Sequence, residues 1–547
     1  MVDTVVFGAL TAVYLAVIML IGYYGYKKTK GAEDYMLAGR KVHPAVLALS
    51  YGATFISTSA IVGFGGVAAQ LGMGLIWLII LNIGLGILIA FVVFGKKTRE
   101  VGLKLKAVTF PHLLGRMYKS DFMQSVTGLI ILVGMPLYTA AILIGGARFI
   151  ETTLAIQYDL ALLGFAIIVA VYVVLGGLIA VMYTDAVQGA IMFFGMIILI
   201  ILTYTLLGGV NTANAELTSM APLVPDGLRN IGMTGWTTFP ELGSTLWLTM
   251  VTTIILGVGI GVLAQPQLVV RFMTVKDNRS LNRAVLVGGI FILVLTGAAY
   301  TVGALTNVYF YQETGQIAVD YVGGNVDQII PAYINSAMPD TFIIVFMLAL
   351  LAAAMSTLSS LFHTMGTSAG YDIWNNLKKS RIAKLWEKGD RPTQADPKEK
   401  SFKSSFRGSQ IGMIIMIVAS IALAYVMPGS IIARATAMFF GLCAAALLPV
   451  YAHGLWSKNP STLAAKASLL VGALAWFSWT AFVHVKESSV LGLSQFLFGK
   501  PAVLGMPWQV VDPLIIALPL STITLILVWF LEKQGLFSGR RGEAVGE

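Results

Sequence analysis

The sequence predicts an all-α integral membrane protein with 13 transmembrane helices. Composition is the first reason. Of the 547 residues, 57% are apolar and only 11% are charged, whereas charged residues make up about a quarter of a soluble domain. The second reason is the length of the apolar runs, because many reach the roughly 20 residues that a helix needs to cross a bilayer. These runs are continuous and lack the alternation of membrane β-strands.

The apolar runs give the expected spans in chain order. The first run follows Asp3 and lacks both a basic leader and a small-residue cleavage site, so we interpret it as a span and not as a signal peptide. The single cysteine, Cys443, excludes a disulfide within the chain. We expect spans at residues 4–25, 45–71, 74–95, 122–150, 158–181, 184–208, 244–266, 282–304, 341–364, 409–427, 431–452, 463–485 and 511–531.

Basic residues fall mostly in alternate loops, and such loops face the cytoplasm. This pattern predicts a protein of the plasma or inner membrane with its N-terminus outside and its C-terminus in the cytoplasm, as an odd number of spans requires. The net charge of +10 is therefore a sign of topology, and we expect no nucleic-acid partner. The cytoplasmic set comprises Lys27, Lys28, Lys30, Arg40, Lys41, Lys96, Lys97, Arg99, Lys104, Lys106, Arg116, Lys119, Arg271, Lys276, Arg279, Arg283, the basic residues of 378–407, Lys533, Arg540 and Arg541.

Two of the spans contain signs of an interrupted helix. Residues 50–66 read SYGATFISTSAIVGFGG and residues 256–266 read LGVGIGVLAQP. Glycines and hydroxyls of this kind also allow close packing of helices. However, the two segments belong to the second and seventh spans, and an offset of five spans gives them opposite orientations in the membrane. Paired broken helices in inverted halves indicate the binding site of a secondary transporter.

The expected organisation follows from these halves. Residues 44–208 form the first inverted repeat and residues 244–452 form the second, which includes a cytoplasmic loop at 378–407. We expect this charge-rich loop to be flexible or partly helical. The remaining parts are the first span with its cytoplasmic loop at 1–43, an extracellular loop at 209–243, and the last two spans with the tail at 453–547.

A stripe of hydroxyls interrupts the ninth span, in the sequence LAAAMSTLSS. Helical spacing places Ala353, Ser356, Thr357 and Ser360 on one face, with Ser359 at its border. One or two hydroxyls can bond to carbonyls of their own helix, but four on one side favour a site for a hard cation, which prefers oxygen ligands. Unwound backbone at Ala53 and Ile56 would supply further carbonyl oxygens.

Asp185, in MYTDAVQG, is the ionisable residue that the sequence places next to an apolar span. Carboxylates inside a membrane segment are costly and usually serve function. Two interpretations remain open: Asp185 binds a second cation, or it caps a helix at the inner interface.

Four stretches together resemble the sodium:solute symporter family, which carries proline, pantothenate, sialic acid, sugars and monocarboxylates. The resemblance implies a LeuT-like core of two inverted five-helix repeats, made of spans 2–6 and 7–11, and Na⁺ as the coupling ion. It implies a main sodium site formed by the carbonyls of Ala53, Ile56 and Ala353 and the hydroxyls of Ser356 and Thr357. It also implies a second site in some members, formed here by Asp185, Ser356, Ser359 and Ser360. The four stretches are LALSYGATFISTSAIVGFGG, GGLIAVMYTDAVQGAIM, AQPQLVVRFMTVKD and LAAAMSTLSSLFHTMGTSAGYDIW.

The substrate should lie beside the broken helices. Tyr138 matches a substrate-contacting tyrosine of proline carriers, but those carriers have an acidic residue at Phe55 and aromatic residues at Val258 and Val262. Because these positions offer no carboxylate to pair with an amine, we expect a small organic anion, such as acetate, propionate, pyruvate or lactate. Two roles stay open for Arg148: it adds positive charge to this site, or it forms an interfacial or structural ion pair, for example with Glu151, which we favour. The candidate contacts are Phe55, Ser57, Thr58, Ser59, Tyr138, Val258, Val262 and Gln265.

Other classes of function stay open at this point. The chain could carry proline, pantothenate or another solute with sodium, or it could sense a solute without carrying it. A channel would need a polar stripe along several helices. An enzyme is not expected, because the sequence shows no nucleophile–base pair and no metal-ligand cluster. A monomer suffices for the expected transport path.

Overall fold

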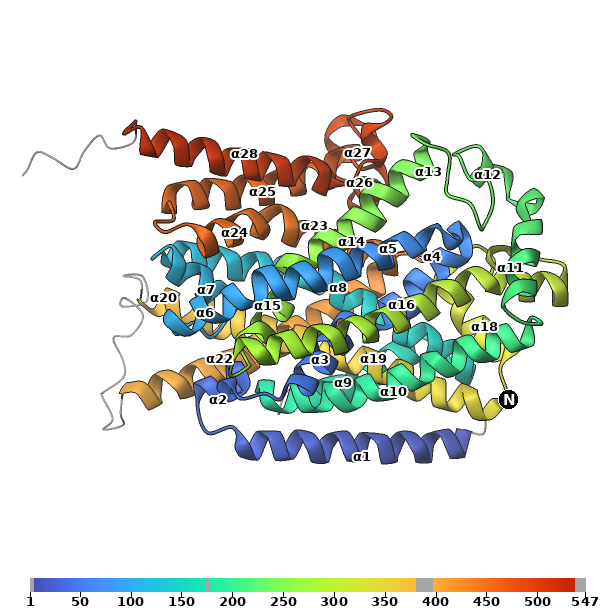
Figure 1. The fold of residues 1–547 in the computed structure, drawn as a ribbon, viewed down its shortest axis with the longest axis horizontal. Helices are drawn as coiled ribbons and strands as arrows, with labels where there is room; N and C mark the ends of the chain where they lie inside the picture. The colour runs from blue at the N-terminus through green and yellow to red at the C-terminus, as the bar shows by residue number, and fades with distance from the viewer. Residues whose placement is uncertain (1–3, 174–176, 380–396, 537–547) are drawn as a thin grey trace, which may run out of the picture.

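The computed structural model describes residues 4–173, 177–379 and 397–536, and in these ranges the chain forms helices and no β-strand. The long helices run along one common direction and form a bundle (Figure 1). The Thr4 end of α1 (Thr4–Lys28) and the Lys533 end of α28 (Pro513–Lys533) lie at opposite ends of this bundle. This placement agrees with an odd number of crossings.

Within the described residues, ten helices are long and apolar enough to cross a membrane, and a bent pair raises the number to eleven. The bent pair is Pro44–Phe55 with Ser59–Leu71, which meet at an angle of 52°. The ten are α1, α8 (Asp121–Leu154), α10 (Gly177–Leu206), the run Thr245–Ala264, α16 (Asn278–Thr314), α19 (Asp340–Thr367), α22 (Pro397–Val426), the run Ile432–Trp456, α25 (Thr462–Phe482) and α28.

The two other expected spans also contain helices, but shorter ones. The expected span at 74–95 contains α5 (Ile76–Leu81) and the π-helix η4 (Asn82–Gly95), and the expected span at 158–181 contains α9 (Tyr158–Val173). Each expected span therefore has a helical counterpart, while the total of 13 crossings stays a prediction.

Several segments between the spans fold into short helices. The expected extracellular loop at 209–243 contains α11 (Val210–Ser219), η5 (Ala221–Leu223) and α12 (Asp226–Arg229). Most of the expected cytoplasmic loop, 380–396, lies outside the described residues, and α22 begins at Pro397, before the predicted start of its span. The other short helices are α2 (Ala32–Leu37), η1 (Ala38–Arg40), η3 (Met73–Leu75), α6 (Lys96–Lys104), α7 (Phe110–Met117), α17 (Ala318–Tyr321), η8 (Val326–Gln328), α18 (Ile329–Ala337), η9 (Ser368–Trp374), α20 (Asn375–Lys379), α26 (Val485–Leu491), α27 (Leu493–Phe498) and η11 (Trp508–Val510).

The first interruption predicted from the sequence is present in span 2. Helix α3 (Pro44–Phe55) ends at Phe55, Ile56 is extended with φ −88° and ψ 108°, and the chain resumes as η2 (Ser59–Gly63) and α4 (Phe64–Leu71). The extended residue turns the backbone out of the helical path, so the last carbonyls of α3 lose their usual partners.

The second interruption lies at the end of span 7. That span consists of α13 (Thr245–Leu248), η6 (Thr249–Gly257), α14 (Val258–Gly261) and η7 (Val262–Ala264). Gln265 is extended, with φ −70° and ψ 122°, and Pro266 then begins α15 (Pro266–Phe272). Proline suits this first helical position because the N–H that it lacks would have no partner there.

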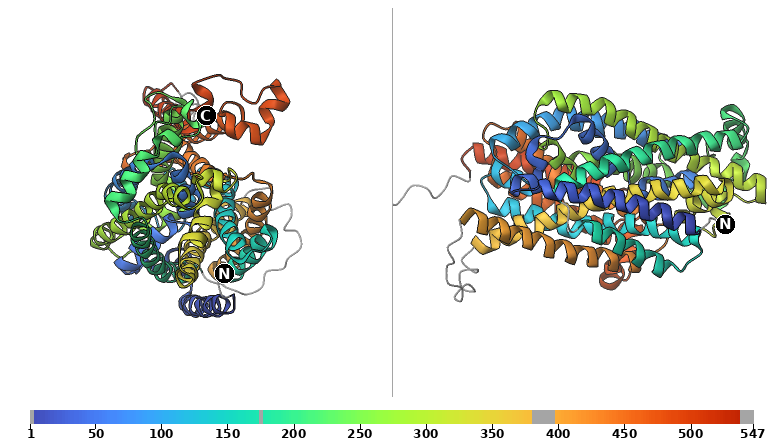
Figure 2. Two further views of the ribbon diagram at one scale, coloured as in Figure 1. Left: turned by 90° about the vertical axis from the view of Figure 1, so that its right-hand side faces the viewer. Right: turned by 90° about the horizontal axis from the view of Figure 1, so that it is seen from below.

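The interrupted helices lie inside the bundle, and other helices surround them. Helix α10 packs against α3, α16 and α19, while α8 packs against α19, α22 and α23 (Ile432–Leu442), which continues as η10 (Cys443–Leu447) and α24 (Leu448–Trp456). Helices α25 and α28 pack on each other at one edge, and α1 lies along the opposite edge (Figures 1 and 2).

Glycines let the second half of the broken span approach its neighbours closely. A Cβ atom at Gly303 of α16 would overlap the carbonyl oxygen of Gly65, and one at Gly66 would overlap the carbonyl oxygen of Val326. Small residues commonly permit this kind of backbone contact between membrane helices. Helix α4 is thereby held between α16 and η8.

This contact predicts the effect of a larger residue at Gly303. We expect Gly303→Leu to lower the free energy of unfolding by about 1–3 kcal/mol, because α16 must move away from α4. Gly297→Leu is the matched control on the same helix, since a Cβ atom there meets nothing within 4 Å. Thermal denaturation of the purified protein measures both effects, and equal losses in the two variants would contradict this account.

Candidate functional site

The hydroxyls of α19 meet the broken end of α3. The Ser356 hydroxyl lies 2.9 Å from the carbonyl oxygen of Ala53 and 3.1 Å from that of Ala353, and the Thr357 hydroxyl lies 3.2 Å from each. Both hydroxyls are fully buried. Ile56 lies at the end of the same helix, where its extended backbone turns the chain away from the helical path. The structure thus brings four of the five expected sodium ligands into mutual contact.

The chemistry of this cluster suits a hard monovalent cation. All of its atoms are neutral oxygens, which hard cations prefer. A hydroxyl can also turn its hydrogen away and offer its lone pairs. Ala53 belongs to span 2, and Ser356 belongs to span 9 and lies 303 residues later in the chain. A cation bound here would therefore join span 2 to span 9.

Asp185 lies deep in the protein and does not cap a helix. Helix α10 begins at Gly177 instead of the predicted residue 184, so Asp185 lies well inside it and is 0% exposed. One carboxylate oxygen is 2.9 Å from a guanidinium nitrogen of Arg271 and 2.9 Å from the Ser50 hydroxyl, and the other is 3.3 Å from the Ser359 hydroxyl. The interpretation of Asp185 as a cap at the inner interface is therefore wrong.

Arg271 is the main correction to the sequence analysis, which placed it in a cytoplasmic loop. It lies in α15, is 1% exposed, and forms an ion pair with Asp185. Its Nη2 is 2.6 Å from both the Thr54 and the Ser360 hydroxyls, and its Nε donates to Ser50 at 3.1 Å. The one available signal was its position within an apolar helix that begins at Pro266, directly after the break.

The expected substrate contacts are brought together only in part. The Tyr138 hydroxyl lies 3.4 Å from that of Ser57. Thr58 donates to the carbonyl of Ile142 at 2.9 Å, and the Ser59 hydroxyl bonds to that of Thr436. Two of the three expected hydroxyls thus hold span 2 to α8 and α23, and Ser57 is the one that faces Tyr138.

The substrate region is closed in this structure. Each of the eight expected contact residues is at most 7% exposed. Val258 and Val262 lie in the last turns before Gln265, whose Oε1 accepts a hydrogen bond of 2.6 Å from Gln267. The Nε2 of Gln265 has no partner among the described residues, although the side chain is 1% exposed. An unsatisfied buried donor is uncommon and calls for an explanation.

Phe440 of α23 is a residue that the sequence analysis missed. Its ring lies 5.3 Å from that of Tyr138, edge to face, and 6.4 Å from that of Phe55. A Cβ atom at Gly261 would overlap Phe440, so α14 also contacts it. The paired aromatics in AMFFG were the available signal, but nothing in the sequence shows which way they face.

A small cavity of about 10 Å³ lies beside Arg271. Its lining includes Ser360, His363, Thr364 and Thr367 of α19, Thr109, and apolar residues such as Met36 and Phe110. The stripe of hydroxyls therefore extends beyond the expected sodium ligands, to Thr364 and Thr367.

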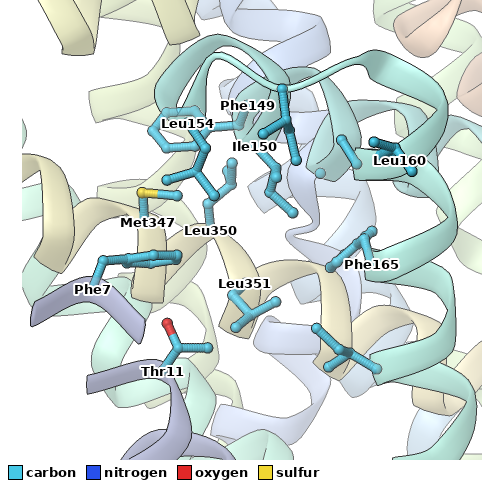
Figure 3. Close-up of a pocket in the computed structure, with 15 residues that line it drawn as sticks. Phe7, Thr11, Phe149, Ile150, Leu154, Leu160, Phe165, Met347, Leu350 and Leu351 are labelled. Atoms are coloured by element: carbon cyan, nitrogen blue, oxygen red, sulfur yellow. The ribbon is translucent and has the colours of Figure 1, made fainter. Parts of the chain in front are cut away.

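A second cavity lies between α1, α8, α9 and α19 (Figure 3). Its lining is almost entirely apolar, with residues such as Phe7, Phe149, Leu160, Met347 and Leu351. None of the expected substrate contacts lines it. Such a lining does not suit a charged solute.

Arg148 pairs with Glu151, as expected from the sequence. Their charged atoms are 2.9 Å apart, and the guanidinium also lies over the Tyr158 ring at 4.0 Å. On the same side, Asp327 of η8 accepts a hydrogen bond from the backbone of Ile431 at 3.1 Å. Burial raises the pKa of Asp327 to about 6, although this bond and the charges of Arg148 and Arg434 act in the other direction.

The profile of the sodium:solute symporter family matches residues 35–472, which include both broken spans, Asp185 and the hydroxyl stripe. The chain belongs to this family. It is accordingly a sodium-coupled membrane transporter and not an enzyme.

Individual members of the family match over most of the chain. The sodium/pantothenate symporter of Haemophilus influenzae is 29% identical over 498 residues, which cover 89% of this chain and 94% of that protein. The sodium/proline symporter of Staphylococcus aureus is 27% identical over 510 residues, which cover 89% of each chain. A Na⁺-coupled sialic acid symporter, solved in a substrate-bound outward-open state, superposes with a TM-score of 0.70 at 18% identity and covers 95% of this chain and 97% of that one. This similarity shows the LeuT-like helical fold.

The raised pKa of Asp327 predicts a dependence of stability on pH. A carboxyl whose pKa rises on folding stabilises the fold fully below its unfolded value, about 3.9, and that contribution is lost as pH rises through the folded value of about 6. We expect Asp327→Asn to remove this decline between pH 4 and pH 6. Thermal denaturation across this range measures it, with Asp320→Asn, an exposed residue of the same segment, as the control. Identical pH profiles for wild type and Asp327→Asn would contradict the assignment.

Proposed function

We propose that the chain imports a small monocarboxylate, of the acetate, propionate, pyruvate and lactate class, together with sodium by alternating access. The observation that carries this proposal is the buried Gln265–Gln267 amide pair, in which Nε2 of Gln265 lacks an acceptor and Oε1 of Gln267 lacks a donor among the described residues. A carboxylate supplies such an acceptor. The Ser57 hydroxyl, which accepts hydrogen bonds from Tyr138 and from the backbone of Ser59, provides a further donor at the break of span 2.

The charge and shape of the region support a short acid. None of the eight expected contacts is acidic, so an amine would meet no carboxylate among them. Phe55 and Phe440, with Val258 and Val262, offer apolar surface to a short carbon chain. The same surface leaves a large polar solute without hydrogen-bond partners, and unpaired polar groups are costly to bury.

Sodium in this proposal binds to the carbonyls of Ala53, Ile56 and Ala353 and the hydroxyls of Ser356 and Thr357. Bound there, it braces the end of α3 against α19, and the adjoining break completes the substrate site. Broken helices bind ions and substrates in this way because their freed backbone groups face the site. After the core rocks, sodium leaves on the side of Ser360 and Thr364, where the hydroxyl stripe of α19 continues.

The proposed setting is the plasma or inner membrane, with the N-terminus outside and the C-terminus in the cytoplasm. The distribution of basic residues supports this orientation. The small cavity beside Arg271 then lies on the cytoplasmic side of Ser356 and Thr357. Sodium would enter from outside, down its concentration gradient, and leave on that side. A single chain is sufficient for this cycle.

Pantothenate is the second candidate, because the sodium/pantothenate symporter of Haemophilus influenzae is 29% identical to this chain. Pantothenate also carries one carboxylate, so Gln265 and Ser57 would serve it equally. Competition for uptake separates this candidate from the short acids, and the same test includes proline.

Uptake into proteoliposomes tests the proposal. We expect labelled pyruvate to accumulate and saturate under an inward sodium gradient, but not under an equal potassium gradient. Ser356→Ala with Thr357→Ala should abolish accumulation, because two of the five ligands are lost. Gly297→Leu, where an added side chain meets nothing within 4 Å, is the control.

The outcomes separate the parts of the proposal. Uptake of pantothenate or proline but not of pyruvate, driven by sodium, would refute the monocarboxylate and keep the sodium site. Equal flux in sodium and potassium would refute the sodium site. Binding of pyruvate without any accumulation would indicate a sensor.

A further inference from the structure

The apolar cavity between α1, α8, α9 and α19 has a volume of about 180 Å³ (Figure 3). A cavity of about 150 Å³ with a lining of this kind stays dry and takes up small apolar molecules. Thr11 is the one polar residue among those that line it, and its hydroxyl has no partner among the described residues. A threonine hydroxyl in a helix can turn to the carbonyl four residues earlier. The cavity therefore suits hydrocarbon better than water or an ion.

The cavity is open on a surface that faces the bilayer. Ile156 and Leu160 line it, and they are also 38% and 62% exposed. Leu163 and Ile167 continue this exposed apolar face along α9. Since α9 belongs to an expected span, hydrocarbon surrounds this face. Lipid chains therefore lie directly at the mouth of the cavity.

The inner wall of the cavity is buried. Phe149 of α8, Phe165 of α9 and Leu350 of α19 all line it, and each of these side chains is almost completely inaccessible from outside. Figure 3 shows the three side chains around one common space. Lipid at the surface of the protein does not reach them unless a chain enters the cavity.

The two parts of α1 are held differently. Near the middle of the helix, Tyr14 accepts a hydrogen bond of 2.9 Å from Gln188 of α10 and donates to the Sδ of Met355 of α19 at 3.7 Å. Nearer the Thr4 end, Phe7 and Thr11 border the cavity (Figure 3). An unfilled gap deprives the atoms around it of dispersion contacts. A molecule in the cavity would complete the packing between α1 and α19.

The size of the cavity selects the occupant. A single turn of an α-helix is about 10 Å wide and about 5.4 Å long, so a helix of a partner protein or of a second copy needs more than the 180 Å³ that is available. An alkyl chain is narrower and flexible, and the bilayer supplies it at high concentration.

We propose that a bilayer lipid inserts one acyl chain into this cavity and thereby packs α1 and α9 onto α19. Leu350 lies within one turn of Ala353, whose carbonyl accepts hydrogen bonds from Ser356 and Thr357. The chain thus contacts the helix that carries the hydroxyl stripe. This inference depends neither on the identity of the substrate nor on the proposed sodium site.

Photo-crosslinking tests the inference. The protein is reconstituted into phosphatidylcholine vesicles that contain a trace of the same lipid with a diazirine midway along one acyl chain. After illumination, mass spectrometry locates the labelled residues. Exposed Ile167 reports the surrounding bilayer. We expect label also on Phe149 and Leu350, which a chain reaches only inside the cavity.

Filling the cavity should remove the label from these two inner positions. Gly164 lines the cavity, and a Cβ atom there meets nothing within 4 Å, so Gly164→Phe can place its ring in the space. Ala161→Leu is a second filling variant, because Ala161 is a buried residue of the lining. Leu163→Phe is the matched control, since Leu163 is exposed on the same helix and lies outside the lining. We expect both filling variants to lose only the inner label and the control to keep all of it.

Thermal denaturation in detergent measures whether the chain stabilises the packing of α1 and α9. A ligand that binds the folded state raises its stability. We therefore expect added phosphatidylcholine to raise the midpoint temperature of wild type and of Leu163→Phe. The rise should be smaller for Gly164→Phe, in which the ring already fills the space.

Two labelling results would overturn the inference. One is label on Ile167 of the wild-type protein without label on Phe149 and Leu350. The other is undiminished inner label in both filling variants, because lipid would then reach these residues by another route. If a filling variant does not fold, the wild-type pattern still decides. An equal effect of lipid on the midpoint temperatures of Gly164→Phe and Leu163→Phe would refute the packing role of the chain.

Discussion

The break in span 2 is the constraint on which the surrounding structure depends. A helix interrupted inside a membrane frees carbonyl groups, and hydrocarbon offers them no hydrogen bonds. The protein must therefore supply partners, and the Ser356 and Thr357 hydroxyls serve the Ala53 carbonyl. This contact fixes which face of α19 is turned toward the end of α3. One turn further along, Ser360 then faces Asp185 and Arg271. The contact between Ser356, Thr357 and the Ala53 carbonyl and the buried ion pair are thus two parts of one arrangement.

The features that could be predicted from sequence have local causes. Glycines, hydroxyls and Pro266 within a few residues indicate the two breaks, and helical spacing puts Ser356 and Thr357 on one face. The ion pair of Arg271 has no local cause of this kind, because its partners Asp185 and Ser50 are 86 and 221 residues away. A basic residue near the end of an apolar run resembles a loop residue until those partners are known. The direction of Phe440 was hidden for the same reason, since tertiary packing decides it.

The limits of the spans were harder to predict than their existence. Hydropathy reports which residues are apolar enough for the bilayer, but it does not report where helical hydrogen bonding begins. It therefore placed the start of span 6 at residue 184, whereas α10 begins at Gly177. Because of that difference, Asp185 lies in the buried interior of α10 and not at a helix end, and it pairs with Arg271 and does not cap a helix. In the same way, α22 extends from its apolar part into the charged stretch that begins at Pro397, where composition alone suggested a loop.

The neutrality of the buried ion pair has a consequence for the energetics of uptake. Asp185 and Arg271 cancel each other, and the other oxygens around Ala53 carry no charge. A core that holds one sodium ion and one carboxylate is then neutral as a whole. A membrane potential, worth about 2.3 kcal/mol per charge at 100 mV, would neither drive nor oppose its movement. The sodium concentration ratio alone would set the limit, so a tenfold ratio could accumulate the acid about tenfold, equivalent to about 1.4 kcal/mol.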